Sequence, residues 1–283
     1  MGRITNSIEL FKASWAVIRQ DRELLALPVV SAIAALGTIA LFAYPIYTTV
    51  NLDAVAADGS STVEASPLTF VLVALAYLIL AFVGIFFNAA LVHATNERMS
   101  GGDPTLSSAL SGASGRVNRI LPWAIVSATV SFIIRQIQER GGLLGGLLGF
   151  LGGVAWSAVT FLVLPILVIE NISVTEAVKR SGGLLRNAWG EGLAGHIGLG
   201  IIGFIAVIPF LLIGALGFVA GSTIVLIPTV TIAVLGLVAV AIVMSALSVV
   251  YQTALYRYAT AQPTVAYSQD LMQSAFVQKR SRR

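Results

Sequence analysis

Long apolar runs separated by short polar connectors dominate the sequence. A bilayer core about 30 Å thick takes roughly 20 apolar residues in a helix. Runs of that length, each expected to form a transmembrane helix, cover residues 24–49, 68–93, 120–137, 143–169, 193–218 and 224–255. The pattern therefore predicts an all-α membrane protein with six transmembrane helices, in a membrane domain that covers residues 24–256.

The last two runs are the hardest to separate. The chain is almost continuously apolar over 193–256, and only the Gly-Ser-Thr sequence at 221–223 indicates a turn. Two long, tilted helices fit this stretch, and Pro209 and Pro228 are expected to bend or interrupt them. Three shorter spans are the alternative, and they would place the C-terminus on the other side of the membrane.

The basic residues predict the orientation, because cytoplasmic loops of membrane proteins carry an excess of Lys and Arg. With six spans, all of the 17 Lys and Arg residues except Arg135 and Arg140 fall on one side. The first connector on the opposite side contains Asp53, Asp58 and Glu64 and no basic residue. We therefore expect a multi-pass protein of the cell membrane with both termini in the cytoplasm.

Residues 1–23 have a helical pattern of their own. Apolar side chains recur there at spacings of three and four residues, at Ile4, Ile8, Phe11, Trp15 and Ile18. This pattern predicts a cytoplasmic amphipathic helix that lies in the headgroup region, with Phe11 and Trp15 as membrane-interface residues. The alternative is that this helix packs against cytoplasmic loops of its own protein.

A similar segment precedes the fifth span. At one constant offset, Glu9, Lys12, Ser14, Val17, Ile18 and Arg19 match Glu176, Lys179, Ser181, Leu184, Leu185 and Arg186. A fainter copy around residues 109–118 precedes the third span, and Trp123 and Trp189 fall at nearly equivalent positions. Trp189 is therefore a third candidate for the membrane interface. The chain is predicted to contain three repeats, each an amphipathic helix followed by a two-span hairpin.

Composition supports the membrane assignment and narrows the chemistry. The chain is 57% hydrophobic and 11% charged, whereas soluble domains carry roughly 25% charged residues. It has no cysteine, which excludes disulfides, thiolate metal sites and cysteine nucleophiles. Two histidines are too few for most histidine-based metal sites, and hydrolase motifs are absent. We predict no cofactor, no metal site, no catalytic residues and no nucleic-acid partner.

Polar side chains inside the spans are candidate functional positions, because burying them in lipid is costly. They are Asn88, His93, Arg135, Glu170 and His196. Most of them lie near a membrane boundary, where long side chains can reach the headgroups. Asn88 lies deepest and is expected to form an interhelical hydrogen bond. An intramembrane enzyme is a third alternative, and it would require His93, His196 and Glu170 to converge.

The start of the fourth span is rich in glycine. Glycines at four-residue spacing are Gly141, Gly145, Gly149 and Gly153. Such small residues let helices approach closely, so tight packing is expected there. A hinge or a pore constriction is the alternative. At the other end of the chain, the basic tail 257–283 is predicted to bind anionic lipid or to be disordered.

Several short stretches, in this order, resemble one family. They are residues 14–15 (SW), 21–25 (DRELL), 86–91 (FFNAAL), 101–104 (GGDP), 160–170 (TFLVLPILVIE), 181–189 and 252–259 (QTALYRYA). The set resembles an uncharacterised family of prokaryotic six-span integral membrane proteins that has only a domain-of-unknown-function label. The resemblance covers roughly residues 5–262. It implies the six-span topology and a bacterial or archaeal cell membrane, and it implies no activity.

These observations favour a non-enzymatic membrane protein that interacts with membrane lipids or scaffolds a protein partner, including a second copy of itself. The interfacial helices, the glycine-rich packing face and the lack of buried charge support this interpretation. The alternative is a small-molecule or lipid transporter built on the internal repeat. A transporter is expected to have a water-filled cavity at mid-membrane lined by Asn88, Arg135 or His196, whereas a dry bundle counts against it.

Overall fold

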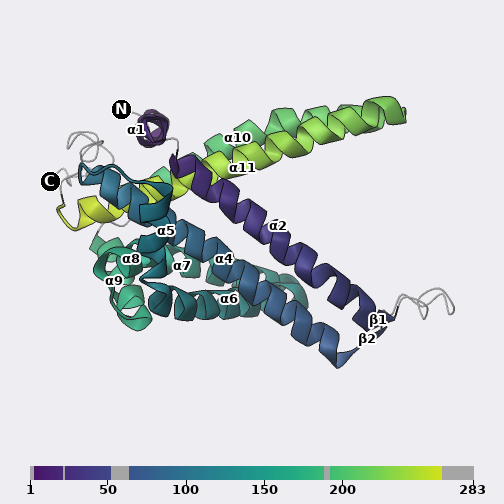
Figure 1. Ribbon diagram of the computed structural model, residues 1–283, viewed down its shortest axis with the longest axis horizontal. Coiled ribbons are helices and arrows are strands. Elements are labelled where there is room, and N and C mark those ends of the chain that lie inside the picture. Colours follow the sequence, from purple (N-terminus) through teal and green to yellow (C-terminus); the bar gives the residue numbers. More distant parts are fainter. Residues whose placement is uncertain (1–2, 22, 52–63, 188–191, 263–283) are drawn as a thin grey trace.

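The computed structural model describes residues 3–21, 23–51, 64–187 and 192–262, which are almost entirely helical (Figure 1). The helices are α1 (Arg3–Gln20), α2 (Glu23–Thr49), α4 (Pro67–Met99), α5 (Leu106–Ser114), α6 (Val117–Arg140), α7 (Gly142–Thr160), α8 (Val163–Glu170), α9 (Val174–Asn187), α10 (Gly192–Val219) and α11 (Thr223–Ala259). Two short strands, β1 (Val50–Asn51) and β2 (Glu64–Ala65), pair antiparallel between α2 and α4.

Six helical stretches in the described residues are long and apolar enough to cross a membrane. They are Glu23–Thr49, Pro67–Met99, Val117–Arg140, Leu144–Glu170, Leu199–Val219 and Thr223–Ala259. This confirms the six apolar helices expected from the sequence and indicates a multi-pass membrane protein. The last apolar stretch forms two helices rather than three. The chain reverses between them at Gly221, whose φ of 62° lies in the left-handed region that glycine adopts without steric cost.

The fourth span is not one continuous helix, as the apolar run suggested. Helix α7 ends at Thr160 and α8 begins at Val163. Pro165 has no N–H to donate to the carbonyl of Phe161, and its ring would crowd that carbonyl in a continuous helix. At the same break, the N–H of Leu162, which a continuous helix would direct to the carbonyl of Ala158, donates to Ser181 Oγ of α9 at 3.2 Å. A side chain from another helix therefore satisfies the backbone at the break.

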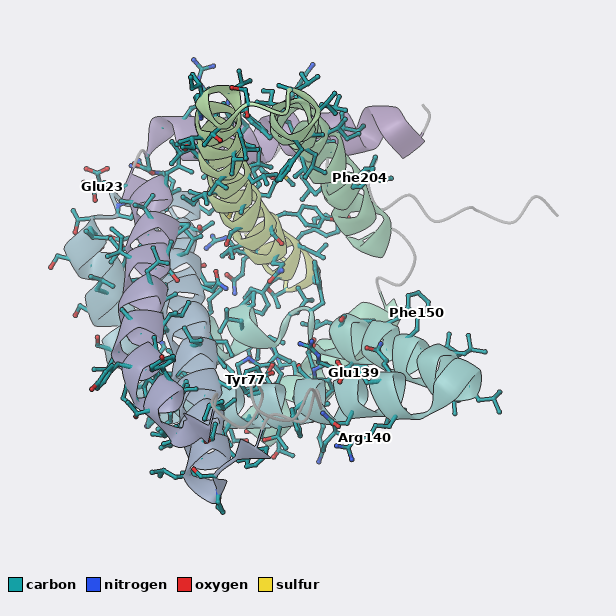
Figure 2. The ribbon with its side chains drawn as sticks, turned by 90° about the vertical axis from the view of Figure 1, so that its right-hand side faces the viewer. Glu23, Tyr77, Glu139, Arg140, Phe150 and Phe204 are labelled. Carbon is teal, nitrogen blue, oxygen red and sulfur yellow. The ribbon has the colours of Figure 1, made fainter. Side chains whose placement is uncertain are left out.

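The spanning helices form three antiparallel hairpins in the described residues: α2–α4, α6–α7 and α10–α11. Figure 1 shows that the hairpins converge at one end of the molecule, where the short helices α1, α5, α8 and α9 also lie. We call this end the hub and the opposite helix ends the tips. In the perpendicular view of Figure 2, the three hairpins occupy separate sectors.

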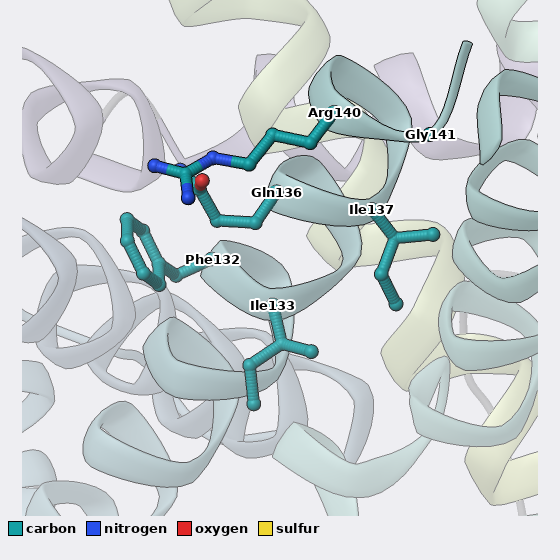
Figure 3. A pocket seen from close by; sticks show the side chains of 6 residues that line it. All are labelled: Phe132, Ile133, Gln136, Ile137, Arg140 and Gly141. Atoms are coloured by element: carbon teal, nitrogen blue, oxygen red, sulfur yellow. The ribbon is translucent and has the colours of Figure 1, made fainter.

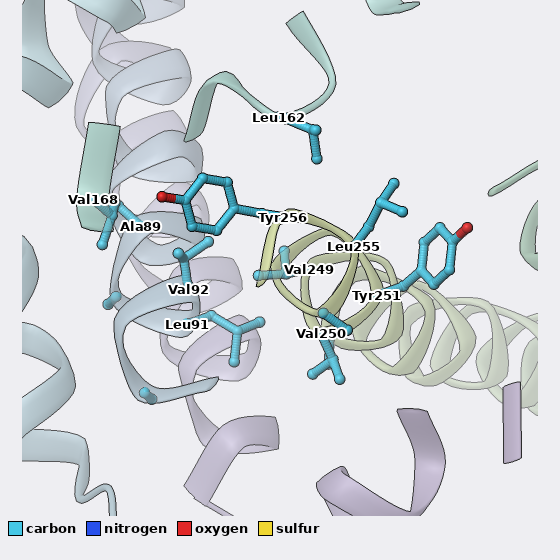
Figure 4. Close-up of a cluster of buried hydrophobic side chains, with 14 of the residues drawn as sticks. Ala89, Leu91, Val92, Leu162, Val168, Val249, Val250, Tyr251, Leu255 and Tyr256 are labelled. Carbon is cyan, nitrogen blue, oxygen red and sulfur yellow. The ribbon is translucent and has the colours of Figure 1, made fainter. Parts of the chain in front are cut away.

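The buried apolar core lies in the hub. Consecutive residues are buried on each of three helices: 89–92 on α4, 165–168 on α8 and 253–257 on α11. These three helices contact one another pairwise. Figure 4 shows the side chains of this core, including Tyr256 beside Val168 and Val92. The hub is therefore a close-packed meeting point of α4, α11 and α8, the short helix that continues the span of α7.

Each short helix beside the hub packs against a hairpin that it does not begin. Helix α5 contacts α4, and α9 contacts both α7 and α8. Helix α1 has no hairpin before it in the chain, and it contacts α10 and α11 of the last hairpin. These contacts connect the three hairpins in a closed order around the core.

Toward the tips, large apolar side chains face outward. Leu144 of α7 is 75% exposed and Ile224 of α11 is 84% exposed. A surface of this kind is suited to contact with lipid tails rather than water. Within the α6–α7 hairpin, a Cβ added to Gly145 would lie 2.6 Å from the carbonyl oxygen of Ile137 on α6. The glycine-rich face therefore serves close helix packing, as the spacing predicted.

Candidate functional site

The polar side chains of the hub join its helices through hydrogen bonds and ion pairs. Arg98, near the end of α4, donates two hydrogen bonds to the carboxylate of Asp21 and one of 2.6 Å to Asp103. Asp21 lies between α1 and α2 and is only 8% exposed. Glu23, at the start of α2, accepts the N–H of Leu106 at 2.6 Å, where α5 begins. These bonds hold the start of α2 against the end of α4 and the start of α5.

Arg257 connects α11 to α4. Its Nη1 donates to Asn96 Oδ1 at 2.7 Å and to Ser100 Oγ at 2.8 Å, and the residue is 4% exposed. Nearby on α4, Glu97 accepts a hydrogen bond of 3.0 Å from Ser108 Oγ of α5. Arg257 was assigned to the basic tail from the sequence, but it lies within the last turn of α11.

Glu170 joins three helices at the end of α8. Its Oε1 accepts hydrogen bonds from the Tyr256 hydroxyl of α11 at 2.7 Å and from Arg180 Nε of α9 at 2.6 Å. A carboxylate with two such donors is well satisfied in place. The arrangement joins α8, α9 and α11, and the described residues place no second carboxylate in hydrogen-bonding contact with Glu170.

The described acids of the hub are all hydrogen-bonded within the protein, whereas several of its described cations have no carboxylate partner. The hub acids with described side chains all accept hydrogen bonds from other residues of the chain: Asp21, Glu23, Glu97, Asp103, Glu170 and Glu176. Five hub cations have no carboxylate partner among the described residues: Lys12, Arg19, Arg116, Arg119 and Lys179. The hub therefore presents cations whose charge no neighbouring acid in the described chain neutralises.

The histidine and glutamate candidates have separate surroundings. The ring of His93 on α4 lies so close to Gly112 of α5 that a Cβ on that glycine would overlap it. Glu170 instead contacts α9 and α11. The side chain of His196 lies outside the described residues. The described part of the chain contains no cluster of three His, Asp or Glu side chains suited to a metal ion.

Asn88 and Arg135 do not share a site. Asn88 is half-buried on α4 and forms no hydrogen bond to another described side chain or backbone group, so its expected interhelical bond is not seen there. Arg135 lies near the tip of α6, is 74% exposed and pairs with Glu139 at 2.8 Å. An open cavity of about 420 Å³ lies beside this tip (Figure 3). Its lining comprises Phe132, Ile133, Gln136, Ile137, Arg140 and Gly141, all from the outer end of α6 and the turn after it.

Comparison with known families gives a match over residues 67–265, to a family described only as one of unknown function. The chain belongs to the DUF6159 family. The matched region begins at the start of α4, so α1 and α2 lie outside it, whereas the sequence resemblance was expected from about residue 5. No protein with a curated description matches the chain. Membership in DUF6159 therefore supports the uncharacterised family and assigns neither an activity nor a substrate.

The first helix of this DUF6159 protein packs against its own chain on one face. Ser14, Val17 and Ile18 are at most 1% exposed in the contact of α1 with α10 and α11. Phe11 and Trp15 remain half-buried, and their rings stack with centroids 6.5 Å apart. The helix therefore combines self-packing with a partly exposed aromatic edge. Trp189, the third interface candidate, lies outside the described residues.

Sequence reasoning about this DUF6159 protein missed two arginines of the hub as candidate site residues. Arg116 and Arg119 counted only as indicators of orientation. In the structure their Nε atoms are buried and have no hydrogen-bond acceptor in the described residues. A local pattern in the sequence could have identified them. The two arginines are three positions apart, directly before the apolar run of the third span, and no acid is nearby in the sequence.

Proposed function

We propose that this DUF6159 protein is a non-enzymatic membrane protein that binds anionic lipids with its hub. In this proposal the hub faces the cytoplasm, both termini are cytoplasmic, and the tips reach the opposite side of a cell membrane. The six apolar helices support the membrane location. The concentration of Lys and Arg at the hub end supports the orientation, following the positive-inside rule.

The observation that supports this proposal most directly is that the hub contains more unpaired cations than unpaired acids among its described residues. Its described acids are all bonded within the chain, whereas Lys12, Arg19, Arg116, Arg119 and Lys179 have no carboxylate partner in the described residues. Each basic residue near an anionic membrane surface contributes about 1 kcal/mol of attraction. Arg116 and Arg119 lie at the start of the apolar helix α6, and Lys12, Arg19 and Lys179 lie on the short helices α1 and α9. In the proposed orientation all five lie at the level of the phosphate headgroups.

Three repeated units, each an amphipathic helix followed by a two-span hairpin, belong to the same proposal. Support comes from the closed order of contacts, in which α5, α9 and α1 pack on the hairpins that contain α4, α8 and α11. Further support comes from the similar burial of residues 89–92, 165–168 and 253–257 toward the hub end of those hairpins. In this arrangement the repeat distributes cations around the hub and gives each hairpin a comparable contact with the hub-side leaflet.

Lipid retention tests the proposed function. The full chain is purified from bilayers that contain phosphatidylcholine and phosphatidylglycerol in equal amounts, and the lipids that remain bound are quantified by native mass spectrometry. The proposal predicts enrichment of phosphatidylglycerol that falls as the salt concentration rises, because exposed charge interactions are screened. Equal retention of the two lipids at low salt, or a stoichiometric protein partner in their place, would contradict it.

A further inference from the structure

Two arginines stand together where α5 turns into α6. Arg116 is the N-cap residue of α6 and Arg119 lies in the first turn, so the two side chains project from neighbouring positions on the helix surface. Arg116 Nη1 donates a hydrogen bond of 2.9 Å to the carbonyl of Gly112 in α5. The side chain of Arg119 forms no hydrogen bond or ion pair with another described residue. The corner therefore holds two guanidinium groups with most of their donors unused by the described chain.

The donors of this corner lack acceptors. The Nε atoms of Arg116 and Arg119 are both buried without a hydrogen-bond partner in the described residues, and a buried unmatched donor is costly. The N-terminus of α6 has no side-chain cap and no acid in its first turn. The first N–H groups of a helix favour an anion, and at this end the N–H of Arg119 is bonded to the carbonyl of Arg116, which leaves those of Val117 and Asn118 without a described acceptor. All three features favour a small anion with several acceptor oxygens, such as a phosphate group.

An apolar strip of α6 continues from the same corner. Pro122 and Val126 follow Arg119 by three and seven residues, which places them on the same side of the helix, and both are exposed. One leaflet is about 15 Å deep, or roughly ten helical residues, and Val126 lies seven residues, or about 10 Å, along the helix from Arg119, so this strip lies within the depth of one set of acyl chains. Ile133, 50% exposed, continues the strip toward the tip cavity of Figure 3. Cations at one end and apolar surface below them fit an amphiphile better than a free anion.

We propose that the corner formed by Arg116 and Arg119 binds the phosphate of an anionic phospholipid whose acyl chains lie along α6. This inference rests on the proposed lipid-binding function and adds the position of one site and the chemistry of its ligand. The planar guanidinium groups supply paired N–H donors that match phosphate oxygens, which a lysine ammonium does not reproduce. Phosphatidylglycerol fits the site better than phosphatidylcholine, because the choline of the latter adds a cation beside the arginines.

The test is a titration of the full chain in neutral detergent with dioctanoyl phosphatidylglycerol, followed by native mass spectrometry. Arg119→Gln is expected to weaken binding at least tenfold, the effect of removing hydrogen bonds to a charged group. The matched controls Arg19→Gln and Lys179→Gln remove other unpaired hub cations, and about fivefold or less is expected for each. Arg119→Lys keeps the charge and loses the paired donors, so its affinity is expected to fall between those of the wild type and Arg119→Gln.

The outcomes separate this site from the general function. If the wild type prefers phosphatidylglycerol and Arg119→Gln weakens binding no more than Arg19→Gln, the corner is not the site and the proposed function stands. If the wild type shows no preference for the anionic lipid, the proposed function fails as well. Full displacement of the lipid by an equal concentration of inorganic phosphate would refute the role of the acyl chains. Unchanged thermal unfolding of the variants controls for folding, and Arg119→Lys gives the answer should Arg119→Gln unfold.

Discussion

The ion pair between Asp21 and Arg98 is expected to be the strongest polar contribution to the stability of the hub. Arg98 binds two acids that differ chiefly in exposure, since the Asp21 side chain is 8% exposed and the Asp103 side chain 91%. Replacing Asp21 by Asn removes a charge-assisted, two-point contact from a buried position, at a cost of about 2–3 kcal/mol. Replacing Asp103 by Asn removes a solvent-exposed ion pair worth under about 1 kcal/mol.

The comparison requires the purified protein in mild detergent and its thermal unfolding followed by intrinsic fluorescence. Asp21→Asn is expected to lower the unfolding midpoint several times more than Asp103→Asn, although both remove one carboxylate from the same arginine. In a double-mutant cycle, the variants Asp21→Asn and Arg98→Gln should show strong coupling, because each removes the same contact. Equal effects of the two aspartate variants, or additive effects in the cycle, would refute the reasoning from burial.

Three further predictions concern packing, the Glu170 contact and orientation. Gly145→Ala should destabilise the protein by about 1–3 kcal/mol because its Cβ meets the α6 backbone, whereas Gly146→Ala, with no atom within 4 Å of its Cβ, should be neutral or stabilising in the same unfolding assay. Tyr256→Phe should cost about 1–2 kcal/mol by removing a hydrogen bond to the half-buried carboxylate of Glu170, and an unchanged midpoint would contradict this. The chain has no cysteine, so Ser60→Cys and Ser281→Cys can be labelled singly in intact cells. Labelling of only Ser60→Cys by an impermeant maleimide supports the proposed orientation, and labelling of both from one side refutes it.

The spanning helices could be predicted from the sequence because a bilayer sets both their length and their composition. The break between α7 and α8 could not be predicted in the same way. Pro165 lies in an apolar run, but Pro45 and Pro209 also lie in apolar runs and remain inside helices. At the break, Ser181 Oγ of α9 accepts the N–H of Leu162. Such a partner becomes visible only when the chain is folded.

The polar contacts of the hub could not be predicted from the sequence either. Asp21 and Arg98 are 77 positions apart, and no local pattern identifies them as a pair. His93 was a candidate for chemistry because a histidine in a span is rare, yet the structure places its ring against Gly112. A polar residue in an apolar run thus indicates an unusual environment, and the environment can be a helix contact as easily as a ligand site.

The division between hub and tips determines how function can be separated from stability in this protein. The hub contains the buried core and the bonds among α4, α8 and α11, so variants there at residues such as Asp21 and Tyr256 are expected to change the free energy of unfolding. The tips expose apolar side chains, and changes there act mainly on contact with lipid. Arg119 differs from both sets of residues. It lies in the hub, but its side chain has no partner among the described residues, so replacing it breaks no described contact. A loss of lipid affinity in Arg119→Gln without a change in the unfolding midpoint would therefore report binding directly, which no variant of a bonded hub residue can do.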